Sequence, residues 1–390
     1  MRILLVQPRL NWEHRWAESP SVALLTLGTV AQNEGHIVKV MHLDIDDVDL
    51  DSYFASEKPD ILGITVNTFQ VKSAREVTKI ARKYPVKIVV GGPHAPVFDG
   101  EYDELVTGEG ENRWLEILGS KRRVESMDGI PMLDYSLVDM SRFSGISPVG
   151  ASPSMAMMAS RGCPFECIFC NTPIFWGKKV RYRSPKLVMD EVCFLHRHYG
   201  IKEMFFQDDT FNLNHEWAEE IFDRIISEEL NQTMCFKICC RVNEKLFTQK
   251  FLDKAKEAGV WNIFFGIESG CQSMLDAMKK GITLAEIERA IVMTNKAHIR
   301  SQCSFIIGMP GESHSTISQT VDFVNKIGPS AVGYCYACPF PMTEFDKEVT
   351  EKGHKREMDY ADYAYGIIMT RTDALDYHNL ETYGSMIYGS

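Results

Sequence analysis

The chain has 390 residues, 45% of them hydrophobic and 24% charged, and this composition predicts a globular protein of two or three domains. Its net charge of -11, with no run of lysines or arginines, gives no electrostatic basis for binding a nucleic acid. No apolar stretch reaches the roughly 20 residues that span a bilayer, and MRILLVQPRL lacks the layout of a signal peptide, so we expect a cytoplasmic protein without a membrane span.

Residues 1–120 alternate short apolar runs with segments of helical periodicity. The apolar runs are RILLVQ, IVKVMHLDI, KPDILGITVN and KIVVGG, and the helical segments include SVALLTLGTVAQNEG and SAREVTKIARKYP. Buried strands that alternate with helices predict an α/β domain with a doubly wound, Rossmann-like parallel sheet. Ligands of such sheets bind at the carboxyl ends of the strands. The residues that the sequence places there are Gln7, Thr65, Asn67, Gly91, Gly92, Pro93, His94, Gly108 and Glu109.

A second βα series follows a segment with proline, glycine and charged residues, 121–152, which we expect to be a surface linker. The strands expected in residues 153–344 are PSMAMMAS, KEMFFQDD, TMCFKICCRV, VWNIFFGIES, IRSQCSFIIGMPG and SAVGYCYACPFP. Parallel strands with covering helices predict a full or partial (β/α) barrel, with its chemistry at the carboxyl ends of the strands. Residues 345–390 are aromatic and acidic without periodicity, and we expect them to cap the barrel.

Three cysteines lie close together in RGCPFECIFCNTP, after the first strand of the expected barrel: Cys163, Cys167 and Cys170. All 11 cysteines of the chain lie at or after Cys163, and an odd number in a long chain argues against a disulfide framework. Three thiolates on one loop can bind three irons of a cubic iron–sulfur cluster and leave the fourth iron open. A structural zinc ion would need a fourth nearby ligand, and the next candidates, His196 and His198, lie in the following helix.

This cysteine motif, C-x3-C-x-aromatic-C with Phe169 as the aromatic residue, resembles that of the radical S-adenosylmethionine (SAM) superfamily. The resemblance covers nearly the whole chain. It implies that the open iron of a 4Fe–4S cluster binds the amino and carboxylate groups of SAM, whose cleavage gives a deoxyadenosyl radical. It also implies an external electron donor of the flavodoxin or ferredoxin type.

The resemblance implies further contacts with SAM at the strand ends of the barrel. These are Asp208 and Asp209 near the methionyl amino group, Arg241 at the carboxylate, Glu268 at the ribose, and Gly308 and Glu312 in the adenine-side turn. Each of these residues also has a purely structural explanation. A carboxylate at a strand end can cap the next helix, an arginine can pair with a structural carboxylate, and a glycine can shape a turn.

The amino-terminal half resembles the cobalamin-binding domain of one large class of these enzymes, and the stretches that carry the resemblance are GGPH at 91–94 and TGEG at 107–110. The Asp-x-His-x-x-Gly motif that supplies a lower histidine ligand is absent, and His14 lacks the surrounding pattern. The resemblance therefore implies cobalamin without a lower histidine ligand, with Thr65 and Asn67 facing its nucleotide tail. The alternative is a domain kept for packing only.

Together, these resemblances imply a cobalamin-dependent radical SAM methyltransferase, in which a deoxyadenosyl radical activates an unactivated substrate carbon and methylcobalamin supplies the methyl group. A cyclase or rearrangement enzyme with the same two domains, and a non-catalytic cobalamin or iron–sulfur sensor, are the alternatives. A small-molecule substrate is favoured over a peptide, since no peptide-recognition domain is evident. Tyr334 and Tyr336 alternate on one strand and are candidate catalytic residues, or packed tyrosines. Cys335 and Cys338 are expected to be core thiols.

Overall fold

The computed structural model describes residues 1–12, 19–143, 145 and 150–388. The chain divides into two compact units, each assembled from separate segments. The first unit consists of Met1–Met158, Arg181–Lys202 and Met358–Ala364, and the second consists of Ala159–Val180, Glu203–Glu357 and Tyr365–Ser390. Among the described residues, no helix is long and apolar enough to cross a membrane.

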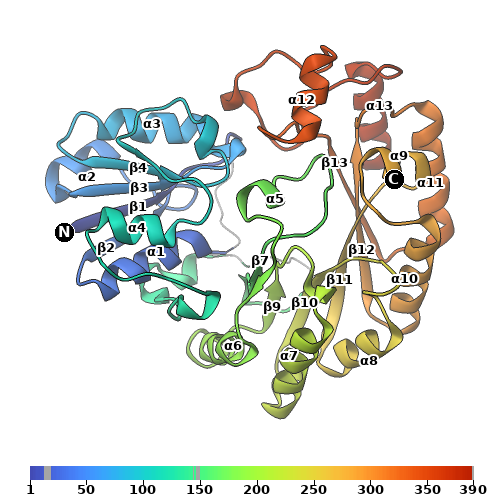
Figure 1. Ribbon diagram of the computed structural model, residues 1–390, viewed down its shortest axis with the longest axis horizontal. Coiled ribbons are helices and arrows are strands. Elements are labelled where there is room, and N and C mark those ends of the chain that lie inside the picture. Colours follow the sequence, from blue (N-terminus) through green and yellow to red (C-terminus); the bar gives the residue numbers. More distant parts are fainter. Residues whose placement is uncertain (13–18, 144, 146–149, 389–390) are drawn as a thin grey trace. The chain divides into compact units, whose positions relative to one another are not determined.

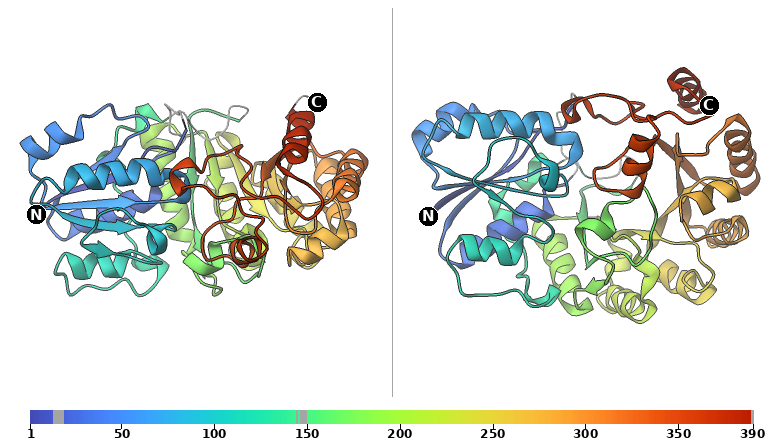
Figure 2. Two further views of the ribbon diagram at one scale, coloured as in Figure 1. Left: turned by 90° about the horizontal axis from the view of Figure 1, so that it is seen from above. Right: turned by 45° about the horizontal axis from the view of Figure 1, so that its top comes forward.

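The first unit contains a five-stranded parallel sheet with the strand order β2-β1-β3-β4-β5. Its strands are β1 (Arg2–Gln7), β2 (Ile37–His42), β3 (Ile61–Thr65), β4 (Lys87–Gly91) and β5 (Glu104–Leu105). Its longer helices are α1 (Val22–Asn33), α2 (Leu50–Glu57), α3 (Val71–Ala81), α4 (Glu111–Ile117) and α6 (Pro185–Tyr199). Figures 1 and 2 show α2 and α3 on one face of the sheet and α1 and α4 on the other. The predicted doubly wound sheet is therefore confirmed.

The strand order of this sheet fixes where a ligand can bind. Because β1 lies between β2 and β3, the connections after β1 and β3 run to opposite sides of the sheet, which opens a crevice at their carboxyl ends. Leu4 and Val6 of β1 pack with Leu62 and Ile64 of β3 in the hydrophobic core below that edge. The polar residues that follow these strands are thus held on a rigid base.

The second sheet has six strands in the order β13-β12-β11-β10-β9-β6, and its pairs from β9 to β13 are parallel. The strands are β6 (Ser154–Met157), β9 (Glu203–Phe206), β10 (Cys235–Cys240), β11 (Val260–Glu268), β12 (Arg300–Ile307) and β13 (Ala331–Tyr336). The helices of the second unit are α5 (Thr172–Phe175), α7 (His215–Ser227), α8 (Gln249–Glu257), α9 (Gln272–Ala277), α10 (Leu284–Lys296), α11 (His314–Ile327), α12 (Glu344–Glu351) and α13 (Tyr377–Tyr388). This open parallel sheet confirms the predicted partial barrel.

The two faces of the barrel sheet differ in burial, as β12 illustrates. Ser301, Cys303 and Phe305 are buried, whereas Gln302 and Ser304, which alternate with them, stay partly exposed. Since alternate residues of a strand point to opposite faces, one face packs against other elements and the other face keeps polar side chains accessible.

Two segments are more ordered than the sequence indicates. In its described residues, the expected surface linker, 121–152, forms three short 3-10 helices, Met127–Gly129, Tyr135–Leu137 and Met140–Arg142, and it buries apolar side chains, so this part also contributes to the packing of the first unit. Tyr135 donates a hydrogen bond to Glu191 Oε1 at 2.5 Å, and Glu191 also pairs with Arg183. The tail contains two helices, α12 and α13, where the sequence showed no periodicity.

Candidate functional site

The loop that carries the three cysteines is fixed at its start by close backbone contacts. It follows β7 (Ser160–Arg161), and Gly162 has a φ of 100°, with its missing Cβ directed at Lys179 O, 2.5 Å away. A residue with a side chain would clash there, so glycine is required. The Cys163 N–H donates to Gly177 O at 3.3 Å. The loop is thus tied to the segment that follows its last cysteine.

The tail packs against the same loop within the second unit. Phe345, in α12, is fully buried in a cluster with Ile168 and Met309, and its N–H donates to Ile168 O at 3.0 Å. Glu344 at the start of this helix forms an ion pair with Lys279 at 2.6 Å. The first part of the tail therefore packs against the cysteine loop and stabilises it.

The three thiols suit a cubic cluster. All three cysteines are partly exposed and free of disulfides. Burial raises the pKa of Cys163 and of Cys170, and the charge of a neighbouring cysteine of the loop raises each further. In the described residues, no three His, Cys, Asp or Glu side chains converge on a point that could hold one metal ion. The thiolates of a cubic cluster each bind a different iron, so they need to surround the cluster rather than converge on one ion.

Arg241 lies immediately after β10 and beside the cysteine loop. Its guanidinium carbon is 3.6 Å from the ring centroid of Phe165, and its Nη1 is 4.0 Å from Cys167 Sγ. Nε donates to Asn243 Oδ1 at 3.0 Å, and Nη2 donates to Lys280 O. This buried cation therefore lies within reach of a group bound at the cluster, and guanidinium geometry suits a carboxylate.

Glu268, at the end of β11, forms a buried ion pair that no sequence pattern indicated. Its Oε1 is 2.8 Å from Lys280 Nζ, and each side chain is 9% exposed. The φ of Glu268 is 69°, and the register of β11 with β12 shifts next to it, which directs its side chain away from the regular strand pattern. Lys280 Nζ also lies 5.9 Å from the ring centroid of Phe169. The only signal for Lys280 in the sequence was the lysine pair in MKKGIT.

Asp208 and Asp209, which follow β9, have different surroundings. Asp208 is 1% exposed and accepts a hydrogen bond from Ser160 Oγ at 2.5 Å, and burial raises its pKa to about 7. Its other oxygen, Oδ2, is buried without a hydrogen-bond partner among the described atoms. Asp209 is exposed and accepts a hydrogen bond from Thr172 Oγ1, two residues after Cys170, at 3.0 Å. Asp209 is therefore the accessible member of the pair near the cysteine loop.

The turn Gly308–Glu312 follows β12. The φ angles of Gly308 and Gly311 are 94° and 87°, which favour glycine. The carboxylate of Glu312 accepts a hydrogen bond from Gly308 N–H, and burial raises the pKa of Glu312 to about 7. Glu312 thus folds back and holds its own turn.

Tyr334 and Tyr336 of β13 contact the carboxy-terminal helix α13. Tyr334 OH donates to Gly384 O at 2.7 Å, and a Cβ on Gly384 would lie 1.6 Å from Tyr336 OH. Cys335, between them, is close enough to Glu268 for its pKa to be raised by that charge, after the larger effect of burial, to about 11. Alternate residues of a strand face opposite sides, so the tyrosines face away from Glu268. Their catalytic role stays a prediction.

In the first unit, most of the predicted cobalamin contacts lie partly exposed at the carboxyl edge of the sheet. These residues are Gln7, Thr65, Asn67, Gly91, Gly92, Pro93, Gly108 and Glu109. Some also have structural partners. Asn67 caps the 3-10 helix η1 (Thr68–Gln70) and accepts from Phe69 N–H at 2.9 Å, whereas Glu109 forms an ion pair with Arg181. A Cβ on Gly92 would lie 2.7 Å from Val66 N, so packing alone requires this glycine.

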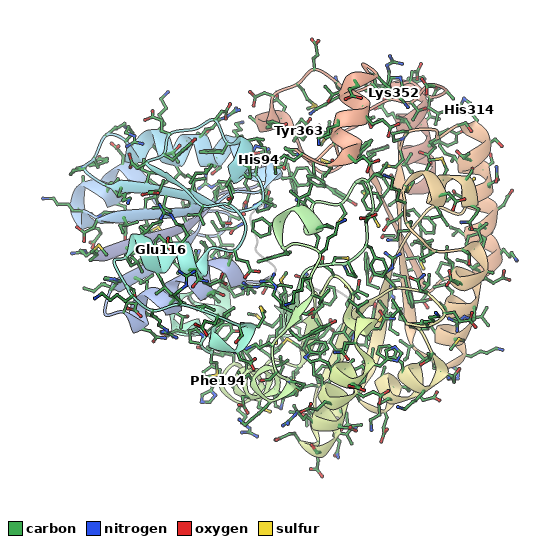
Figure 3. The ribbon with its side chains drawn as sticks, in the orientation of Figure 1. His94, Glu116, Phe194, His314, Lys352 and Tyr363 are labelled. Carbon is green, nitrogen blue, oxygen red and sulfur yellow. The ribbon has the colours of Figure 1, made fainter. Side chains whose placement is uncertain are left out.

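His94 is the exception, because it is 1% exposed. Its Nδ1 lies 3.1 Å from Thr68 Oγ1, and its ring packs edge-on against Tyr360 at 4.7 Å. Burial lowers the pKa of His94 to about 4, so the ring is neutral at physiological pH. Figure 3 shows His94 and Tyr363 on neighbouring segments of the first unit. A contact between His94 and cobalamin stays a prediction, and His14 lies outside the described residues.

Two family models match the chain. The radical SAM superfamily model matches residues 157–324, and the B12 binding domain model matches residues 14–118. These matches confirm the predicted cofactors, a 4Fe–4S cluster, SAM and cobalamin. The cysteine loop and the residues of the exposed edge other than Gln7 lie within the matched ranges.

Curated and solved proteins are similar to this chain. An uncharacterized methyltransferase of Pyrococcus horikoshii, PH0819, is 32% identical over 385 residues, which cover 88% of this chain and 82% of the relative. An anaerobic magnesium-protoporphyrin IX monomethyl ester cyclase of Rubrivivax gelatinosus is 24% identical, with 96% and 74% covered. The structure of the radical SAM methyltransferase TsrM from Kitasatospora setae, with tryptophan substrate and a SAM analogue bound, has a TM-score of 0.72 at 23% identity, with 90% and 76% covered.

Proposed function

The chain belongs to the family of cobalamin-dependent radical SAM methyltransferases, and on this premise we propose that it transfers a methyl group to an unactivated carbon of a small molecule. The observation that carries the proposal is the joint presence of a three-thiol loop in the second unit and a doubly wound sheet with an exposed carboxyl edge in the first. One supplies ligands for a cluster, and the other offers a crevice for a large, flat cofactor.

When bound, the cluster and SAM supply the radical chemistry, and cobalamin carries the methyl group. The residues of the chain would position these groups. Cys163, Cys167 and Cys170 would each hold one iron through a thiolate. Arg241, already oriented by Asn243 and by the Phe165 ring, would pair with the methionyl carboxylate.

Glu268, Asp209 and the turn Gly308–Glu312 would complete the SAM site. The carboxylate of Glu268 is desolvated and held by Lys280, so its free lone pairs would accept hydrogen bonds from ribose hydroxyls. Asp209 would accept from the methionyl amino group, because its exposed carboxylate lies next to the cysteine loop. The backbone of the glycine turn would face the adenine ring. Most of these groups are held by neighbours, which lowers the ordering cost of binding.

A small-molecule substrate is supported by the partly exposed polar residues of the barrel sheet, such as Gln302 and Ser304. TsrM, which shares the fold, was solved with tryptophan as its substrate. Cyclisation without methyl transfer is the second candidate, because a cyclase of Rubrivivax gelatinosus aligns with 96% of the chain. Either reaction would need an external electron donor of the flavodoxin or ferredoxin type.

The coproducts of SAM separate the two candidates. We expect the reduced holoenzyme, incubated with cell extract and methyl-labelled SAM, to label a metabolite and to form both adenosylhomocysteine and deoxyadenosine. Methyl transfer and radical formation each consume one SAM, so the two coproducts should appear in comparable amounts. Mass spectrometry and chromatography measure the product and both coproducts.

The variant Arg241→Ala is the control for cofactor-dependent turnover. Loss of a charge-assisted hydrogen bond to a carboxylate costs about 1.5–3 kcal/mol, so both coproducts should fall together. Deoxyadenosine without adenosylhomocysteine would favour cyclisation or rearrangement. Adenosylhomocysteine alone would contradict radical chemistry.

A further inference from the structure

The segment Met369–Leu380 of the tail is attached to the second unit through its backbone. The Arg356 N–H donates to Met369 O at 2.8 Å, and the Arg371 N–H donates to His354 O at 3.0 Å. Between these bonds, Lys355 and Thr370 form an antiparallel bridge. The segment after residue 368 therefore has a defined register against residues 354–356.

Two threonines of this segment hydrogen-bond to the turn Gly308–Glu312. Thr370 Oγ1 donates to Gly308 O at 3.3 Å, and Thr372 Oγ1 donates to Glu312 O at 2.8 Å. Thr370 is 1% exposed and Thr372 is 2% exposed. These two hydroxyls bind the carbonyls of the first and last residues of the turn.

Thr372 is itself fixed in place. Its Oγ1 accepts hydrogen bonds from the N–H groups of Ala374 at 3.2 Å and Leu375 at 2.9 Å, and its own N–H donates to Leu375 O at 2.9 Å. A threonine hydroxyl has two lone pairs, which here accept these two hydrogen bonds, and one proton, which it can donate to a single acceptor. That acceptor is the carbonyl of Glu312.

The turn is held by contacts from within and by contacts from the tail. Both glycines have positive φ angles, and within the turn the Glu312 carboxylate accepts from Gly308 N–H while Glu312 N–H donates to Met309 O at 3.0 Å. Leu380 lies beside Gly308, since a Cβ added there would be 3.5 Å from Leu380 Cδ1. The tail thus contacts the turn through two hydrogen bonds and one leucine.

The helix that follows is anchored to the same unit at two points. Tyr334 OH donates to Gly384 O at 2.7 Å, and His314 Nδ1 lies 2.6 Å from Tyr383 OH. His314, labelled in Figure 3, begins α11 two residues after Glu312. Helix α13 is therefore secured both to β13 and to the helix that starts at the turn.

We propose that Thr370 and Thr372 are positioning residues for SAM, which hold the adenine-side turn in its binding conformation, so that the tail forms part of the SAM site. This inference rests on the proposed function, because it takes the turn Gly308–Glu312 as a contact of SAM. The threonines act through the turn and do not touch the cofactor. The tail is then a functional element and not only a cover of the barrel.

The test measures the affinity of reconstituted full-length protein for SAM, by isothermal titration and by the change that SAM causes in the electron paramagnetic resonance spectrum of the reduced cluster. Thr372→Val keeps the shape of the side chain and removes the hydroxyl. We expect it to raise the Kd for SAM about three- to tenfold, the range for one lost hydrogen bond. Thr372→Ser, which keeps the hydroxyl, should restore the affinity to within about twofold.

Thr294→Val is the matched control. Thr294 is fully buried in the same unit, and its Oγ1 donates to Ala290 O at 2.7 Å within α10, which precedes β12, whereas the turn follows the other end of that strand. It should lower the melting temperature without changing the Kd for SAM. If Thr372→Val and Thr370→Val both bind SAM as tightly as the unmodified protein, the inference is wrong. If the unmodified protein itself does not bind SAM, the proposed function fails instead, and if Thr372→Val does not fold, Thr370→Val decides.

Discussion

Two buried carboxyl groups of the second unit, Asp208 and Glu312, have pKa values that burial raises to about 7. An unfolded chain would release these protons near pH 4, so between about pH 4 and pH 7 the folded protein binds more protons than the unfolded one. The free energy of unfolding therefore decreases as the pH rises through this window. The decrease ends once both carboxyls are ionised in the folded protein.

Glu312→Gln should remove part of this pH dependence, since the amide oxygen can still accept the hydrogen bond from Gly308 N–H but does not titrate. Between pH 6 and pH 8, the unmodified protein should lose roughly 1 kcal/mol of stability through Glu312 alone. Denaturant unfolding at the two pH values, monitored in the second unit, measures the loss. We expect a smaller loss in the variant.

The control is Glu288→Gln, which changes an exposed glutamate that pairs with Lys326. The free energy of unfolding of this control variant should depend on pH as it does in the unmodified protein. An equally steep loss in Glu312→Gln would show that Glu312 is already ionised at pH 6, contrary to the effect of its burial.

At the scale of elements, the cysteine loop is a self-contained cluster site. Gly162 and Gly177 close the loop at its base, and Phe345 of α12 packs beneath it. Each thiol should bind one iron, so the loss of any one thiol leaves an iron exposed to solvent. We therefore expect the cluster to need all three cysteines together.

Cys163→Ala, Cys167→Ala and Cys170→Ala should each lose the cluster, and Cys338→Ala should keep it. Under anaerobic reconstitution, the unmodified protein should contain roughly four irons and four sulfides per chain. Iron and sulfide analysis, with the visible absorption spectrum, measures both. Cys338 is the matched control because it is also a free thiol of the second unit. Cluster loss in Cys338→Ala would instead indicate a second metal site.

The regular elements could be predicted from sequence, and the irregular ones could not. RILLVQ and KIVVGG became β1 and β4 because a buried parallel strand needs an unbroken apolar run. The tail gave no such signal, since α12 and α13 are short helices stabilised by contacts with distant segments. Likewise, Lys280 pairs with Glu268 only because the segment that carries Lys280 folds back to the end of β11. No local sequence pattern encodes this contact.

The carboxyl edge of the first sheet, where cobalamin is expected to bind, also could be predicted only in part. The sequence correctly predicted which partly exposed residues follow the strands, because parallel strands have their carboxyl ends on one side of a sheet. It did not indicate that His94 is covered. The covering residue, Tyr360, comes from the segment Met358–Ala364, which belongs to the first unit although it lies far along the chain.

At the scale of the whole molecule, the residues expected to bind cobalamin and those expected to bind the cluster lie in different compact units. The five-stranded sheet lies in the first unit, and strands β9 to β13 of the six-stranded sheet lie in the second. The hydrophobic cluster around Leu4 and the cluster around Phe345 are separate. Domains with separate cores can fold and bind ligands independently. Loss of one cofactor should therefore leave the binding of the other intact.

The separate units and the missing histidine motif together determine how cobalamin should bind. A variant with Cys163, Cys167 and Cys170 all changed to alanine should bind cobalamin with a Kd within about twofold of the unmodified protein, because these residues lie outside the cobalamin unit. In both proteins, the paramagnetic resonance spectrum of cob(II)alamin should lack splitting from a nitrogen ligand. His94 is 1% exposed and is held by Thr68 at Nδ1 and by the ring of Tyr360, so it would have to move to supply that ligand. Nitrogen splitting that disappears in His94→Ala would show that the segment around Tyr360 opens to release the histidine. Splitting that disappears in His14→Ala would identify the ligand as a histidine outside the described residues, despite the absent motif.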